Sequence, residues 1–158
     1  MSPQRLKRFR KRIVVIVEDS TTLLRMLSDA ISDLPIDVMT ATTAEGGLDI
    51  MQSLVTDLVV QDVFMPGRGG LWAIEQMRER DPDVKILAIS GGWGAMESDR
   101  TLKAAKVLGC DACLIKPFDM AVFRQQVIDL LGGEFAEIAA SEEKTATSDP
   151  STLRFSEA

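Results

Sequence analysis

Several short apolar runs of this 158-residue chain are each followed by a polar side chain that could do chemistry. These side chains are Glu18, Asp19, Asp62, Ser90 and Lys116. Neighbouring carboxylates repel one another unless a cation joins them, and oxygen ligands in a chain without histidine favour Mg2+. A carboxylate beside such an ion can attack a phosphoryl donor while a lysine neutralises the phosphoryl oxygens. The residue types therefore predict Mg2+-assisted phosphoryl transfer, provided that the fold brings them together.

The elements that must position these side chains alternate between short apolar runs and helix-length amphipathic segments. The apolar runs predict strands at 13–17, 37–41, 58–62, 84–89 and 112–115. The amphipathic segments predict helices at 21–34, 43–54, 71–80, 97–108 and 120–131. Strands that are apolar throughout are buried on both faces, which predicts a parallel sheet covered by helices. The predicted fold class is α/β, a doubly wound five-stranded parallel sheet with strand order 2-1-3-4-5.

The carboxyl ends of the strands are where such a sheet binds its ligand, at the switch point between strands one and three. Strand one ends at Glu18 and Asp19, and strand three ends at Asp62. Strand four ends at Ser90 and strand five at Lys116. One aspartate after a strand is usually a helix cap or a loop residue, but five such residues at four strand ends are hard to explain in that way. We therefore expect these five residues to meet in one crevice.

Four segments of the chain resemble, in order and in spacing, the signature blocks of response-regulator receiver domains, which have a flavodoxin-like fold. They are IVVIVEDS (13–20), LVVQDVFMPGRGG (58–70), LAIS (87–90) and LIKPF (114–118). The resemblance covers residues 13–131 and implies a two-component signalling protein. Residues 132–158 show no helix-turn-helix pattern and no second core, which predicts the stand-alone, single-domain type. The resemblance also implies a cis peptide bond before Pro117, in keeping with the near restriction of cis bonds to proline.

The resemblance implies a role for each candidate site residue. Asp62 would be the phosphoacceptor, Lys116 would pair with the phosphoryl group, and Ser90 would hydrogen-bond that group. The resemblance further implies a set of Mg2+ ligands, which comprises Asp19 and Asp62 directly, Glu18 through water, and the backbone carbonyl of Phe64.

One position departs from the family pattern. Receiver domains usually carry Tyr or Phe three residues before the motif lysine, and here that position is Cys113 in a chain without tyrosine. A switch that depends on movement of an aromatic ring is therefore not expected, although phosphorylation is. Cys113 also forms a C-x-x-C pair with Cys110. This pair precedes a strand, whereas thioredoxin-like pairs open a helix, so two small packed residues are the favoured interpretation and redox sensing the alternative.

Charge and composition divide the chain into three parts. Residues 1–12 form a basic N-terminal arm with six basic and no acidic side chains, although the whole chain has a net charge of −6. Such an arm could contact nucleic acid, anionic lipid or an acidic partner, but a solvated terminus is the favoured interpretation. Residues 13–133 form the predicted receiver domain. From Glu134 onward Ala, Ser, Thr and Glu predominate without periodicity, which predicts a disordered C-terminal tail over 134–158.

These features also predict partners and location. No apolar run approaches the ~20 residues of a membrane span, and a cytoplasmic protein is expected. The expected phosphoryl donor is a histidine kinase or a histidine phosphotransfer protein. The expected output is in trans, through a downstream protein that docks on the face formed by the fourth helix, the fifth strand and the last helix. A homodimer is left open, and nucleic acid is not expected as a partner.

Two other function classes compete with phosphorelay signalling. An aspartyl-type phosphatase or phosphotransferase typically shows D-x-D after the strand, but Asp62 is followed by Val63 and Phe64. We therefore expect no enzyme activity beyond the domain's own phosphorylation and dephosphorylation. The alternative is a receiver fold that acts as an interaction module without phosphorylation. The clustered carboxylates argue against it, because a scaffold gains nothing from their repulsion.

Overall fold

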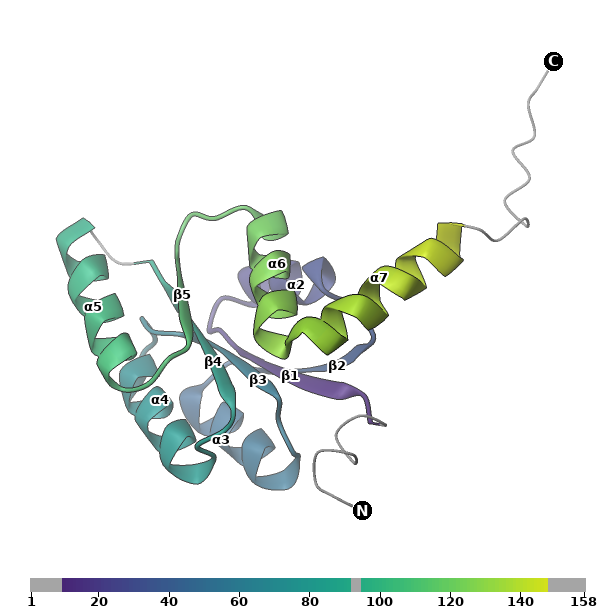
Figure 1. Cartoon of the computed structure of the whole chain (residues 1–158). Helices are drawn as coiled ribbons and strands as arrows, with labels where there is room; N and C mark the ends of the chain where they lie inside the picture. The colour runs from purple at the N-terminus through teal and green to yellow at the C-terminus, as the bar shows by residue number, and fades with distance from the viewer. Residues whose placement is uncertain (1–9, 92–94, 148–158) are drawn as a thin grey trace.

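The computed structural model describes residues 10–91 and 95–147, in which strands and helices alternate (Figure 1). The strands are β1 (Arg12–Val17), β2 (Ile36–Ala41), β3 (Leu58–Asp62), β4 (Lys85–Ser90) and β5 (Ala112–Ile115). The helices are α2 (Thr21–Ala30), α3 (Ala44–Ser53), α4 (Gly69–Arg80), α5 (Ala95–Val107), α6 (Met120–Leu131) and α7 (Gly133–Thr147). Within these described ranges no helix combines the length and the apolar character that a membrane crossing requires.

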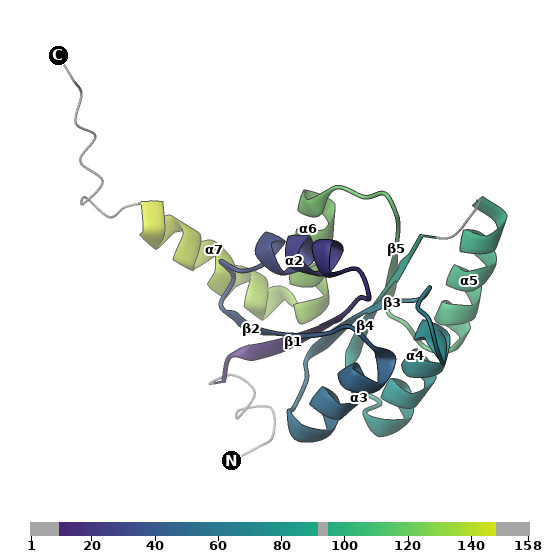
Figure 2. The same cartoon turned by 180° about the vertical axis from the view of Figure 1, so that it is seen from behind.

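The strands form one parallel sheet in the order β2-β1-β3-β4-β5, which confirms the predicted fold class. Helices α2, α6 and α7 lie on one face of this sheet, and α3, α4 and α5 lie on the other (Figures 1 and 2). The three-layer arrangement buries both faces of the central strands. It therefore explains why residues 13–17 of β1 and 58–60 of β3 are apolar without alternation.

Two hydrophobic cores lie on opposite faces of the sheet. Val14 and Ile16 of β1 point into the core formed with α2 and α6, where Phe123 is fully buried. Their neighbours Val15 and Val17 point into the core formed with α3 and α4. Successive residues of one strand thus serve both cores, because strand side chains alternate between the two faces.

The helix boundaries follow local capping chemistry. Helix α2 begins where the Ser20 hydroxyl accepts a hydrogen bond from the amide of Leu23, so Ser20 is the N-cap. The predicted helix 21–34 ends early, at Ala30, and the chain continues through a turn to β2. Helix α5 ends before Gly109, whose φ of 104° lies in the region that glycine adopts without strain.

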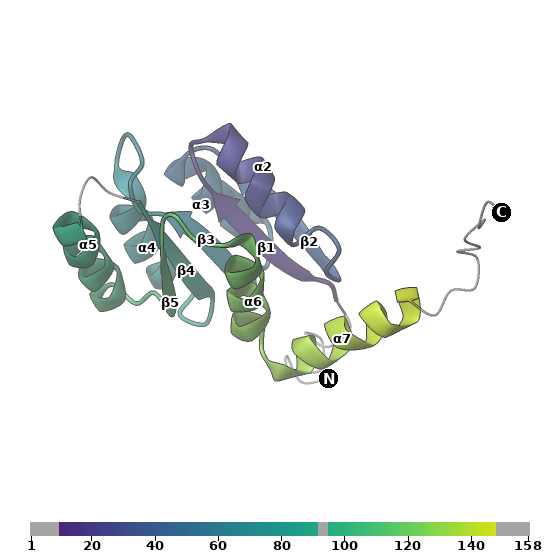
Figure 3. The ribbon, with the colours of Figure 1, turned by 90° about the horizontal axis from the view of Figure 1, so that it is seen from above.

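The prediction of a disordered tail from residue 134 is wrong for residues 134–147, which belong to α7. Phe135 and Ala139, one helical turn apart, are both buried in the core that α2 and α6 share. Arg124 of α6 adds hydrogen bonds to Asp33 and to Glu143 of α7. Helix α7 follows directly on α6 (Figure 3). Residues 148–158 lie outside the described residues.

The predicted arm of residues 1–12 also proves to be partly structural. Arg12 is the first residue of β1, and the Arg10 guanidinium donates to both carboxylate oxygens of Asp57, at 2.8 and 2.9 Å. Asp57 accepts a further bond from the amide of Ile13, at 2.8 Å. The end of the arm is therefore fixed to the turn before β3, while residues 1–9 lie outside the described residues.

Candidate functional site

The ammonium group of Lys116 joins two of the carboxylates at the strand ends. Lys116 Nζ lies 3.1 Å from Glu18 Oε2 and 3.1 Å from Asp62 Oδ2. Glu18 and Asp62 are almost completely buried, with 1% and 2% of their surfaces exposed. Two carboxylates in so little water require a counter-charge, and Lys116 provides it. The charged residues at the ends of β1, β3 and β5 thus bind one another at the carboxyl edge of the sheet.

Asp62 is held rigidly at the end of β3. Its Oδ1 accepts the amide of Phe64 at 3.0 Å, so each of its two oxygens has a partner. The start of α4 packs directly behind it, since a Cβ built at Gly70 would lie 2.2 Å from the carbonyl oxygen of Asp62. Only glycine permits this approach of the α4 backbone to the strand end.

Lys116 reaches the carboxylates because its backbone is hydrogen-bonded to β4 and because a glycine leaves space for its side chain. The Lys116 amide donates to the carbonyl of Ser90 at 2.7 Å. A Cβ built at Gly91 would lie 2.6 Å from Lys116 Cδ, so the lysine stem crosses over this glycine. The Lys116–Pro117 peptide bond is cis, as the family resemblance implied.

The acidic pair after β1 divides into one buried and one exposed carboxylate. The amide of Ser20 donates to Glu18 Oε1 at 3.0 Å, while Asp19 is exposed to solvent. Burial raises the pKa of Glu18, and the nearby Asp62 raises it further. The smaller burial of Asp19 and the adjacent Glu18 raise the pKa of Asp19. Burial opposes the charge of Lys116, but the attraction of Asp62 and Glu18 outweighs it and raises the pKa of Lys116.

Two buried polar atoms in the described residues have no hydrogen-bond partner, namely Ser90 Oγ and Gln61 Oε1. Ser90 is fully buried and follows Ile89, the residue paired with Asp62 across β3 and β4. An unpaired buried hydroxyl costs on the order of 1–3 kcal/mol of stability. We therefore expect a ligand or a water molecule to hydrogen-bond with Ser90 Oγ. Gln61 was not among the predicted site residues. A polar residue inside the apolar run LVVQD was the signal that could have found it.

The donor set fits a hard divalent cation. Glu18, Asp19 and Asp62 each offer one carboxylate oxygen, and these oxygens lie within 4.8 Å of one another. One lysine cannot balance three carboxylates, so the site favours an additional positive charge. All-oxygen ligands with one exposed carboxylate suit Mg2+, which keeps part of its water shell. That the backbone carbonyl of Phe64 also binds the ion stays a prediction.

Glu18, Asp19, Asp62 and Lys116 are thus brought together as the sequence indicated, with Ser90 on the adjoining strand. Cys113 lies on β5, three residues before Lys116, and its sulfur contacts Cys110 rather than any residue of this site.

A five-stranded sheet of this order with acidic residues at the ends of β1 and β3 and a lysine after β5 defines a receiver domain. The chain belongs to the response regulator receiver domain family of two-component systems, whose family model matches residues 14–128. The predicted extent of 13–131 agrees with this match to within a few residues.

Curated relatives and solved structures give the same class. The chain is 34% identical over 108 residues to the probable C4-dicarboxylate response regulator DctR of Halalkalibacterium halodurans, covering 66% of this chain and 45% of the relative. It is 28% identical over 123 residues to the chemotaxis protein CheY of Treponema pallidum, covering 75% of this chain and 81% of the relative. The chain therefore spans about half the length of DctR, and the aligned part is only 12% of the sensor histidine kinase RcsC of Salmonella typhimurium.

The fold is similar to that of receiver domains whose structures are solved. A CheY-like receiver domain of Methanospirillum hungatei superimposes with a TM-score of 0.71 at 20% identity, over 77% of this chain and 94% of the other. The receiver domain of NtrX from Brucella abortus gives 0.68 at 23% identity, over 75% and 97%. At these identities the likeness concerns the fold alone.

Proposed function

We propose that this protein is a response regulator that accepts a phosphoryl group on Asp62 from a histidine kinase or a histidine phosphotransfer protein. The observation that carries the proposal is the contact of Lys116 with both Asp62 and Glu18 beside the unpaired hydroxyl of Ser90. A purely structural ion pair would explain why Lys116 contacts the two carboxylates, but not why the Ser90 hydroxyl is buried without a hydrogen-bond partner. A phosphoryl group on Asp62 accounts for both, because its oxygens would accept hydrogen bonds from each.

The chemical step follows from the positions of these groups. An oxygen of Asp62 attacks the phosphorus of a phosphohistidine, the P–N bond breaks, and the imidazole leaves with the bonding electron pair. The amide of Phe64 holds Asp62 Oδ1 at 3.0 Å and so fixes the orientation of the carboxylate. Lys116 and Ser90 then donate to the phosphoryl oxygens, where negative charge gathers in the transition state.

The residues that would hold Mg2+ are Asp19 and Asp62 directly, Glu18 through water and the carbonyl of Phe64. Such an ion would neutralise phosphoryl oxygens and reduce the repulsion among the carboxylates. The exposure of Asp19 supports this assignment, since it leaves one side of the cluster open to an ion that retains water ligands.

We further propose that output occurs in trans, through a partner protein that docks on α5, β5 and α6. Each of these elements exposes a large aliphatic side chain, Val107, Ile115 and Val122 respectively, with exposures of 87%, 54% and 48%. Ile115 directly precedes Lys116, so a residue of this face and a residue of the phosphoryl site are neighbours in the chain.

The test is acyl phosphate formation. The full chain is incubated with acetyl phosphate and Mg2+, and its intact mass is measured with and without a chelator. We expect one phosphoryl adduct on the wild type, none on Asp62→Asn, and slower formation when Mg2+ is removed. The matched control is Asp83→Asn, an exposed aspartate before β4 that should leave the adduct unchanged.

An adduct of equal yield on Asp62→Asn would place the acceptor elsewhere. No adduct on a folded wild type, together with no spectral response to beryllofluoride, would favour the interaction module that works without phosphorylation.

A further inference from the structure

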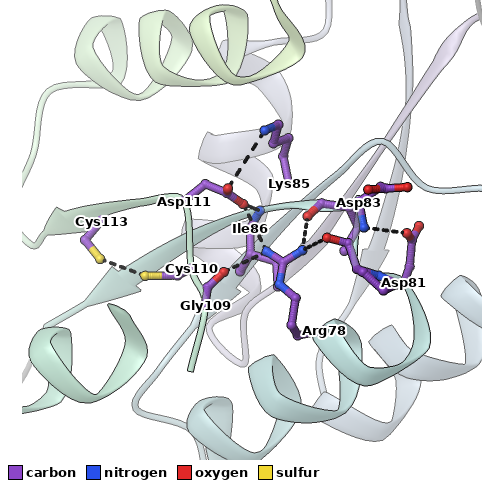
Figure 4. Close-up of polar contacts among 11 residues, drawn as sticks. Arg78, Asp81, Asp83, Lys85, Ile86, Gly109, Cys110, Asp111 and Cys113 are labelled. Atoms are coloured by element: carbon purple, nitrogen blue, oxygen red, sulfur yellow. Dashed lines mark hydrogen bonds and ion pairs between the residues drawn. The ribbon is translucent and has the colours of Figure 1, made fainter. Parts of the chain in front are cut away.

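The two cysteines of the chain lie in contact at the junction of α5 and β5. Cys110 Sγ and Cys113 Sγ are 3.2 Å apart, both side chains are partly exposed, and neither is in a disulfide (Figure 4). A disulfide bond requires about 2.05 Å between the sulfurs. The two thiols are therefore about 1 Å from bonding distance, which small rotations of the side chains can supply.

The fold, rather than chance rotamers, holds this pair together. The Arg78 guanidinium of α4 donates to the carbonyl of Gly109 at 2.7 Å and to Asp111 Oδ2 at 3.1 Å (Figure 4). Asp111 Oδ2 also accepts the amide of Ile86 in β4 at 2.8 Å. The residues before and after Cys110 are thus fixed to α4 and β4, while Cys113 is fixed within β5 by pairing with β4. The backbone segments that carry the two sulfurs are therefore held in place on both sides.

Small molecules can reach the pair. A surface pocket of about 280 Å³ is lined by both cysteines and by residues of α5 that include Lys103 and Lys106. Its volume is close to the lower end of the range for small-molecule sites. Asp111 also lines the pocket, but its carboxylate is paired with Arg78 at 3.1 Å, and Lys103 is paired with Asp99 at 2.8 Å. Lys106 therefore favours an anionic thiol compound, since an ammonium group attracts carboxylates and stabilises thiolates. A fully packed structural pair would have neither the pocket nor the charge.

The two thiols have different acidities. The hydrogen bond between them, opposed by burial and aided by Lys106, lowers the pKa of Cys113 to about 7. The same contact and burial raise the pKa of Cys110. We therefore assign the first attack to Cys113 and the second step to Cys110.

We propose that Cys110 and Cys113 form a redox-active dithiol that is oxidised to an intramolecular disulfide by low-molecular-weight disulfides such as oxidised glutathione. The Cys113 thiolate attacks one sulfur of the small disulfide, forming a mixed disulfide and expelling one thiolate. The Cys110 thiol gives up its proton and attacks Cys113 Sγ, which expels the second thiolate. Two protein thiols are thereby oxidised by two electrons, and one small disulfide is reduced to two thiols.

The disulfide would tie the turn after α5 to the strand that leads to Lys116. The thiol chemistry itself is independent of phosphorylation at Asp62. Only its consequence for docking, a change in the surface formed by α5 and β5, rests on the proposed function.

The experiment measures oxidation of the wild-type chain without any phosphoryl donor. Reduced protein is equilibrated with glutathione mixtures in which the oxidised fraction increases. The samples are then quenched in acid and alkylated, and their intact masses are measured by mass spectrometry. We expect conversion to a monomer that has lost two hydrogens and takes up no alkylating agent. Cys110→Ser should accumulate a glutathione mixed disulfide on Cys113. Cys113→Ser should react more slowly at pH 7, because burial and the adjacent Asp111 still raise the pKa of the remaining Cys110 thiol.

The pH dependence separates this site from two inert packed cysteines. In the wild type, alkylation of the first thiol should rise with pH through about 7, as Cys113 becomes a thiolate. The proposal is overturned if both thiols stay reduced at every glutathione ratio, or if they react only as urea unfolds the protein. Equal mixed-disulfide formation by the two serine variants would overturn the assignment of the first attack to Cys113.

Discussion

Replacement of Phe135 by alanine tests whether α7 is an integral part of this domain. Phe135 is 3% exposed and lies in the core shared by α2 and α6, whereas Ile138 of the same helix is 43% exposed. The two positions therefore separate core packing from any general effect of substitution in α7. We expect Phe135→Ala to destabilise the protein and Ile138→Ala to leave its stability nearly unchanged.

The magnitude follows from the buried surface. A buried phenylalanine removes at least about 150 Å² from water, worth about 4 kcal/mol at ~25 cal/mol per Å². Alanine retains part of that burial and forms helix slightly better, and a terminal helix can shift to fill the cavity. These effects reduce the expected loss to about 3 kcal/mol, at the lower end for such substitutions. For a domain of this size the loss corresponds to a fall in Tm of roughly 6–12 °C.

Urea unfolding followed by circular dichroism gives the free energy of unfolding by linear extrapolation. Ile138→Ala should change it by less than about 0.5 kcal/mol, as expected for a surface site. If both variants lose the same small amount, α7 is not docked and the packing of Phe135 contributes nothing to stability. A large loss in both would indicate that α7 is buried by something other than this core.

Three other substitutions address the frame and the site. Gly70→Ala should cost about 2 kcal/mol or more of stability in thermal melts, because its Cβ would lie 2.2 Å from a backbone oxygen, while Gly133→Ala meets no atom within 4 Å and serves as the control. Arg10→Ala should cost about 1 kcal/mol in low salt and less in high salt, since it removes a partly exposed ion pair with Asp57, and a loss that salt does not change would contradict an electrostatic origin. Lys116→Gln should slow acyl phosphate formation by about a hundredfold while the protein stays folded, and an unchanged rate would exclude the lysine from the transition state.

Local pattern was sufficient for most of the sheet and for the residues of the site. Apolar runs such as Val14–Val17 and Leu58–Val60 identify buried parallel strands, because both faces of a central strand must be covered. The chain direction then places the residue after each run at the same edge, which is why Asp62 and Lys116 could be paired although 54 positions separate them. The same local rules fail at α7. Its few apolar residues predict disorder. The segment is nevertheless helical, because Phe135 packs into a core formed by other elements.

The sequence by itself determined the fold class, the acidic cluster and its lysine, since each depends on periodicity or on which residue ends a strand. Tertiary structure alone decided contacts between segments that no local pattern relates. Arg10 reaches Asp57 across 47 positions, and Arg78 reaches Asp111 across 33. The second of these contacts fixes the residue after Cys110, whose sulfur lies 3.2 Å from that of Cys113. The C-x-x-C spacing alone did not show that the two thiols are in contact. The physical reason is the same in each case, because burial and pairing depend on neighbours in space rather than neighbours in the chain.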